Sequence, residues 1–265
     1  MKNFVSIVLV TIILAANVFT ASAVELAELN FRSLETGVLS VEYQMNTKND
    51  TRIMIENNGE RQFYRLSYDR QQENFPLKQG NGAYTIAVLE HVNGNQYRPI
   101  VTEQLRVSNV DETKMYLGSV QEIKWNESMI SVQKAHELTQ GLQTEAEKVE
   151  AIYDYIVQNI RYDYEKVTAL TSDYLPDIET IFEENKGICY DYASLFAAML
   201  RSVGVPARMA KGYAPGIVEY HAWNEVLVDG EWIVIDTTMD AAYAARGVAY
   251  DMIKNAEEFQ KQIAI

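Results

Sequence analysis

The 265-residue chain contains a single cysteine and only three histidines. One cysteine cannot form an internal disulfide bond, and it excludes a zinc site built from a set of cysteines. Basic residues are also few, because 23 lysines and arginines stand against 37 acidic residues and the net charge is −14. This balance argues against nucleic acid and anionic membrane surfaces as partners.

The N-terminus carries a long apolar run that differs from the rest of the chain. Lys2 supplies positive charge, residues 4–16 are almost continuously apolar, and Ala21-Ser22-Ala23 has the small-x-small pattern of a cleavage site. The run is short for a membrane anchor, so we interpret residues 1–23 as a secretory signal peptide cleaved after Ala23. We therefore expect a secreted or cell-surface protein with no stable membrane span after cleavage.

Residues 30–125 have the pattern of a small β-domain. Apolar and polar residues alternate in short runs, and Asn58-Gly59 and Asn93-Gly94 are turn signals because these residues accept positive φ angles. Strands are expected at 39–45, 52–55, 63–68, 84–88 and 104–107. Many short strands at turn spacing predict an antiparallel sandwich of the immunoglobulin-like type. His91 lies here without companions, and we interpret it as structural.

Residues 131–265 instead predict helices followed by strands, which is an α+β arrangement. Thr144 and Glu147 form a capping box before an apolar stripe of helical spacing, and His136 lies alone on an earlier helix. We expect helices at 131–141, 144–160, 177–186, 189–202 and 251–263. We expect strands at 208–213, 221–228 and 231–236, and a loop at 161–176.

Cys189 begins an apolar helix, directly after Gly187-Ile188. The positive end of a helix and its unpaired amides stabilise a thiolate over a thiol, and the same amides can stabilise an oxyanion. A buried structural cysteine is the alternative, and it is the commoner situation for a lone cysteine. A catalytic role requires a base and a group that orients the base.

The turn Asp229-Gly230 indicates which residues could supply these groups. A two-residue turn fixes the pairing of the strands on either side, and this register places Trp223 opposite Asp236. His221 then lies on the same face as Asp236, roughly 7–8 Å away at the backbone. A hydrogen bond can bridge that gap, whereas a slip of one residue would put the two on opposite faces. The sequence alone does not show that Cys189 meets them.

Three motifs, in this order, resemble the core pattern of the transglutaminase-like superfamily, and the resemblance covers roughly residues 140–240. The intervening segments 200–208 and 212–213 match as well. The motifs are Gly187-Ile188-Cys189-Tyr190-Asp191-Tyr192-Ala193, His221-Ala222-Trp223 and Trp232-Ile233-Val234-Ile235-Asp236-Thr237-Thr238.

The resemblance implies a papain-like α+β core, with helices packed on an antiparallel sheet. It implies Cys189 as the nucleophile, His221 as the general base and acid, and Asp236 as the group that orients the histidine. Thr237 departs from the family, where proline is frequent after the aspartate, but this departure leaves the three residues intact.

The family also takes a second oxyanion donor from an aromatic side chain upstream of the cysteine. Tyr162, Tyr164 and Tyr174 are all candidates, and the sequence does not choose between them.

These observations lead us to expect a secreted cysteine acyl-enzyme that cleaves or transfers amide bonds of protein or cell-wall peptides through a thioester. Hydrolysis and transamidation share this intermediate, so both remain open. No calcium-binding loop or nucleotide-binding motif is evident, and no cofactor or metal is expected. The alternative is a surface binding or adhesion protein whose transglutaminase-like domain is a non-catalytic scaffold.

Overall fold

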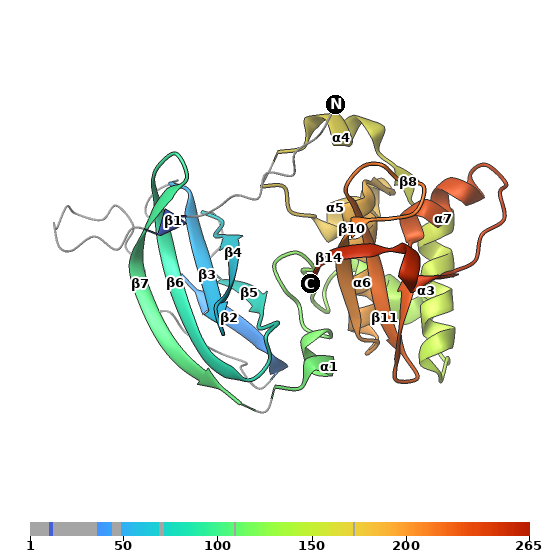
Figure 1. Cartoon of the computed structure of the whole chain (residues 1–265). Coiled ribbons are helices and arrows are strands. Elements are labelled where there is room, and N and C mark those ends of the chain that lie inside the picture. The colour runs from blue at the N-terminus through green and yellow to red at the C-terminus, as the bar shows by residue number, and fades with distance from the viewer. Residues whose placement is uncertain (1–10, 13–35, 44–48, 69–71, 109, 172) are drawn as a thin grey trace. The chain divides into compact units, whose positions relative to one another are not determined.

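The computed structural model describes residues 11–12, 36–43, 49–68, 72–108, 110–171 and 173–265. The chain forms two compact units, Met1–Asp111 and Glu112–Ile265 (Figure 1). Residues 112–125, which the sequence-based boundary placed with the β-domain, lie in the second unit. Apart from residues 11–12, the predicted signal peptide lies outside the described residues. Among those that are described, no helix is both long and apolar enough to cross a membrane.

The first unit is the expected β-sandwich, with two sheets of different size. The larger has the order β1-β7-β6-β3-β4 and the smaller pairs β2 with β5. Among the described strands of this unit, only β1 and β7 pair in parallel. Leu39 and Phe75 from the small sheet pack in one buried cluster with Ile53 and Ile86 from the large sheet. The strands are β1 (Thr11–Ile12), β2 (Val38–Glu42), β3 (Thr51–Asn57), β4 (Glu60–Arg65), β5 (Gln72–Pro76), β6 (Gly82–Asn93) and β7 (Gln96–Val107).

Both turn predictions in this unit are confirmed. Asn58 and Gly59 have φ angles of 52° and 84° and join β3 to β4. Gly94, at φ 50°, lies in the turn between β6 and β7. The hairpins therefore form where the sequence supplies residues that tolerate a left-handed backbone.

The second unit combines helices with an antiparallel sheet of order β13-β12-β11-β10-β14. Helix α6 contacts β10 and β11 of this sheet, and α2, α3, α5 and α7 contact α6. The helices are α1 (Glu112–Met115), α2 (Ile130–Leu138), α3 (Glu145–Asn159), α4 (Tyr164–Ala169), α5 (Ile178–Glu184), α6 (Cys189–Ser202) and α7 (Thr237–Ala244). The strands are β8 (Arg161–Tyr162), β9 (Lys186–Gly187), β10 (Ala207–Tyr213), β11 (His221–Val228), β12 (Glu231–Ile235), β13 (Ile253–Lys254) and β14 (Gln260–Ala264).

Helix α6 is central because apolar residues surround almost its whole length. Leu195, Phe196 and Met199 have no exposed surface. Burying a side chain of this size stabilises the fold by roughly 1.5–3 kcal/mol relative to leaving it exposed. The rigid core of the unit therefore holds the helix whose first residue is Cys189.

The prediction of a helix at 251–263 is wrong. This segment forms β13, a 3₁₀ turn at Ala256–Glu258 and β14, which pairs with the edge of β10. Gly212 makes the close pairing possible, since a Cβ there would lie 2.1 Å from the carbonyl oxygen of Gln260. The segment contains several Glu, Lys and Gln residues, which favour a helix locally, but pairing with the sheet outweighs that preference.

Two further elements differ from the expectation. The segment expected to be a loop, 161–176, contains β8 and the short helix α4. Helix α7 was not predicted; it begins directly after Asp236, whose side chain caps it. Both differences lie beside the candidate site.

Candidate active site

Cys189 is the first residue of α6 and is partly exposed. It follows Ile188, whose backbone is extended, and Gly187, which belongs to β9. A Cβ on Gly187 would lie 2.5 Å from the Cβ of Asp191, so only glycine fits this approach. The Gly-x-Cys spacing therefore has a steric cause: the turn into the cysteine helix passes directly over the side chain of its third residue.

Asp191 holds the beginning of this helix in place. Its fully buried carboxylate accepts hydrogen bonds from the Ile188 amide at 3.0 Å, the Lys166 ammonium at 2.7 Å and the Tyr174 hydroxyl at 2.5 Å. Sequence reasoning missed this role, although an acidic residue at the third position of a helix is a recognisable capping signal. Three hydrogen bonds to this one carboxylate thus hold the turn that carries the thiol.

His221 and Asp236 meet as the hairpin register predicted. The strands pair Val228 with Glu231 through to Asn224 with Ile235. The His221 Nε2 atom lies 2.8 Å from the Asp236 Oδ2 atom, and the two side chains are 5% and 0% exposed. The predicted proximity of the imidazole and the carboxylate is confirmed.

The electrostatics of His221 link it to both Asp236 and Cys189. Burial lowers the pKa of His221, but the hydrogen bond and charge of Asp236, together with interactions with the Cys189 side chain, outweigh it and raise the pKa from 6.5 to about 10. Since Nε2 faces Asp236, Nδ1 is the ring nitrogen left for the thiol. The three residues singled out from the sequence therefore lie together, with the histidine in the middle.

Asp236 has a second contact that the sequence did not suggest. Its Oδ1 atom accepts a hydrogen bond from the Met239 amide at 3.0 Å, which makes it the N-cap of α7. Because the same carboxylate bonds to His221, helix α7 fixes the orientation of the group that holds the imidazole.

Neighbouring residues fasten the hairpin to the cysteine helix. The buried Asn224 side chain donates a hydrogen bond from Nδ2 to the Ala193 carbonyl of α6 at 2.9 Å. The Trp223 ring stacks beside the His221 ring, with 6.4 Å between the ring centroids. It also packs on the Phe259 ring, with 5.0 Å between centroids. Packing and a buried hydrogen bond thus set the position of His221 relative to α6.

Of the three candidate tyrosines, Tyr162 lies beside Cys189. It pairs with Gly187 between β8 and β9, and burial and the charge of Cys189 raise its pKa to about 12. Tyr174 donates its hydroxyl hydrogen to Asp191, and Tyr164 is 73% exposed. Tyr162 makes no side-chain hydrogen bond to any residue that the structure describes, so its hydroxyl is available to a substrate.

The other two histidines have other partners. His91 Nε2 lies 2.9 Å from the Gly94 carbonyl, and His136 forms an exposed contact of 3.3 Å with Glu127. Within the described ranges, no group of three or more His, Cys, Asp or Glu side chains is arranged to hold a metal ion.

Comparison with known proteins adds a family to this geometry. Residues 132–237 match the Transglutaminase-like superfamily. Over 124 residues the chain is 32% identical to YebA of Bacillus subtilis, and the match covers 39% of this chain and 17% of YebA. Over 112 residues it is 31% identical to human kyphoscoliosis peptidase, covering 38% of this chain and 17% of the peptidase. The chain thus spans less than a fifth of the length of these relatives.

A solved structure from Cytophaga hutchinsonii, described as that of a candidate cysteine protease, is also similar. It shares 19% sequence identity, with a TM-score of 0.46, over 86% of this chain and 74% of the other.

Proposed function

Because residues 132–237 make this chain a member of the transglutaminase-like superfamily, we propose that it is an acyl-enzyme with Cys189 as nucleophile. His221 is its general base and acid, and Asp236 orients the histidine. The observation that carries the proposal is the 2.8 Å contact of His221 Nε2 with Asp236 Oδ2, on an imidazole that also interacts with Cys189. This is the arrangement that covalent acyl chemistry needs.

The reaction has two steps. The Cys189 thiolate attacks the carbonyl carbon of an amide, and the carbon–nitrogen bond breaks as the His221 imidazolium gives its proton to the leaving amine. Water or a second amine then attacks the thioester, His221 takes up the proton of that nucleophile, and the thiolate leaves. Asp236 stays ionised throughout and stabilises the imidazolium.

Tyr162 completes the oxyanion site in this proposal. The amides at the start of α6 point toward the oxyanion from one side, and the Tyr162 hydroxyl donates from the other. Its pairing with Gly187 and the effect of Cys189 on its pKa favour it over the two other tyrosines.

The substrate is a protein or a cell-wall peptide outside the cell. The apolar run and cleavage pattern of residues 1–23 support export, and the β-sandwich unit suits work at a surface or on large substrates. The reaction needs no cofactor.

Incubation with a glutamine-containing peptide, with and without a primary amine, tests the proposal. Ammonia release with amine incorporation would identify a transferase, and peptide-bond cleavage a protease. If neither reaction occurs and Cys189 forms no acyl adduct, the non-catalytic scaffold becomes the better account. That alternative is favoured by no residue of the site, since all three members are present.

A further inference from the structure

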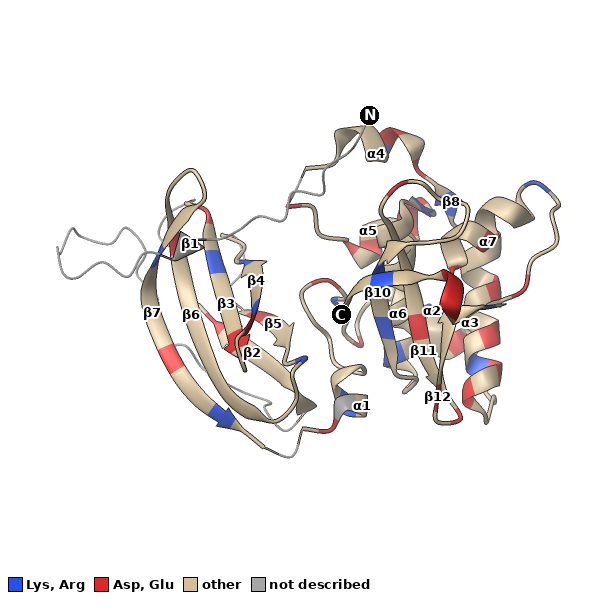
Figure 2. Ribbon diagram, in the orientation of Figure 1, with Lys and Arg blue, Asp and Glu red and all other residues tan. Residues whose placement is uncertain are grey.

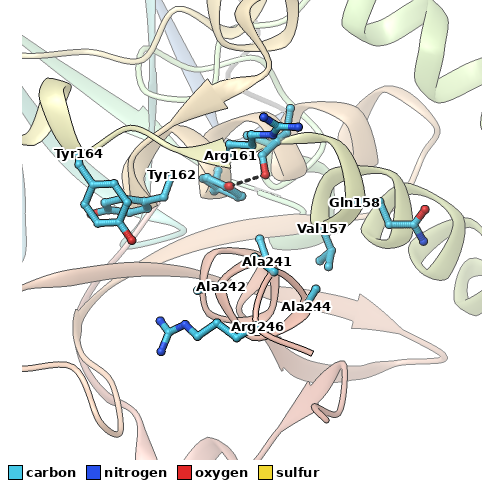
Figure 3. Close-up of a pocket in the computed structure, with 12 residues that line it drawn as sticks. Val157, Gln158, Arg161, Tyr162, Tyr164, Ala241, Ala242, Ala244 and Arg246 are labelled. Carbon is cyan, nitrogen blue, oxygen red and sulfur yellow. Dashed lines mark hydrogen bonds between the residues drawn. The ribbon is translucent and has the colours of Figure 1, made fainter. Parts of the chain in front are cut away.

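A cavity of about 590 Å³ lies on the side of Tyr162 formed by the end of α3, β8 and α7 (Figure 3). Its walls are largely apolar, with Val157 and Ile160 from the end of α3 and Ala241 and Ala244 from α7. The volume is within the range of about 300–1,000 Å³ typical of small-ligand sites. The cavity can therefore hold a short aliphatic segment.

Its charged lining is entirely basic. Arg161, from β8, and Arg246, just after α7, are the only charged residues among those that line it. Neither side chain forms an ion pair with any residue in the described ranges. Acidic residues nevertheless outnumber basic ones in the chain, and several lie along α3 (Figure 2). Each guanidinium group is exposed beside this apolar cavity and can bind a carboxylate, which arginine does in a forked geometry.

The cavity shares its walls with the elements that carry the reacting groups. Tyr162 borders it and pairs with Gly187, two residues before Cys189. Tyr192, one turn along α6 from the cysteine, also lines the cavity and donates its hydroxyl hydrogen to the Ile160 carbonyl at 2.7 Å. A group bound there is therefore held by the same rigid elements as the thiol.

We propose that this cavity selects acyl substrates with a carboxylate-bearing side chain or terminus close to the attacked amide. The inference rests on the proposed function and names its substrate class: acidic peptides. The aliphatic part of the acidic residue packs on the alanines of α7, and its carboxylate pairs with one of the two guanidinium groups.

Binding to a Cys189→Ala variant tests the inference without relying on turnover. Two fluorescent heptapeptides carry a central glutamine and differ only in having Glu or Gln two positions away. We expect the Glu peptide to bind about tenfold more tightly, as one charge-assisted hydrogen-bonded pair would give. Arg161→Gln and Arg246→Gln should each reduce this preference, and the double variant should abolish it.

Lys134→Gln is the charge-matched control, because Lys134 is on α2 and does not line the cavity. It should leave the preference for Glu unchanged. Equal affinity for the two peptides, including no measurable binding of either, would overturn the inference, as would a preference that survives the double arginine variant. A Glu preference in a protein that forms no acyl adduct would instead contradict the proposed function alone.

Discussion

The carboxylate of Asp236 holds His221 with one oxygen and caps helix α7 with the other. Its Oδ2 atom lies 2.8 Å from His221 Nε2, and its Oδ1 atom accepts the Met239 amide at 3.0 Å. One side chain thus serves both the orientation of the imidazole and the stability of the helix, and substitutions can separate the two roles.

Asp236→Asn should disturb the orientation of the imidazole but keep the cap of helix α7. Its amide can donate to Nε2, which favours the tautomer with a proton on Nδ1 facing the thiol, so kcat/KM should fall on the order of 10³-fold or more. Its oxygen still caps α7, so Asp236→Ala should be less stable than Asp236→Asn by about 1 kcal/mol. Amide-cleavage or amine-incorporation kinetics measure the loss of kcat/KM, and urea unfolding measures the difference in stability. Equal stability of the two variants would contradict the capping role.

The raised pKa of His221 predicts a pH-dependent stability. The pKa rises from 6.5 to about 10 on folding, so protonation favours the folded state. This contribution is fully present below pH 6.5 and is lost as the pH rises through about 10. The difference in free energy of unfolding between the wild type and His221→Gln should therefore shrink across that interval.

Urea unfolding at several pH values checks this expectation. In an Asp236→Asn background, the effect of His221→Gln should depend much less on pH, because the main charge that raises the pKa is gone. If the difference in free energy of unfolding between the wild type and His221→Gln grew with rising pH, it would contradict a raised pKa of this imidazole.

Tyr162→Phe should lower kcat more than it changes KM. Removing one oxyanion donor typically costs about 10²- to 10³-fold in kcat, since the interaction is made in the transition state. Tyr164→Phe and Tyr174→Phe are matched controls: one hydroxyl belongs to an exposed side chain and the other bonds to Asp191. A larger loss of kcat in either control than in Tyr162→Phe would assign the oxyanion role elsewhere.

The sequence predicted the hairpin and the meeting of His221 with Asp236 because a two-residue turn determines strand register. Asn224 pairs with Ile235 as that rule requires. It also predicted the cysteine helix, where the glycine and the apolar face are local signals. The contacts that these signals specify lie within a few residues of one another or across a single turn.

Other features could not be predicted, because they depend on partners far along the chain. The C-terminal segment becomes β14 only by pairing with β10, against its own helical composition. Tyr162 could not be chosen over Tyr164 or Tyr174 until the pairing of β8 with β9 placed it beside Gly187. The N-cap role of Asp236 was hidden because the residue was counted as the end of a strand.

Gly187→Ala should destabilise the start of α6. The added methyl group would lie 2.5 Å from the Asp191 Cβ and 3.0 Å from its Oδ2, which forces the carboxylate away from the Ile188 amide. Overpacking of this kind costs about 1–3 kcal/mol, and we expect slower acylation of Cys189 as well. Asn185→Gly is the control, because Asn185 has φ 52° in the preceding turn, a conformation that glycine adopts freely. Unchanged stability of Gly187→Ala would contradict the steric account of the Gly-x-Cys spacing.

The most direct test of the central claim is the mass of the protein after reaction with an acylating peptide probe. The account predicts one acyl group per protein, attached to Cys189, formed at a rate that falls sharply in His221→Ala. Acylation of Cys189 at the same rate in His221→Ala would contradict it, because the histidine would then contribute nothing to the nucleophile.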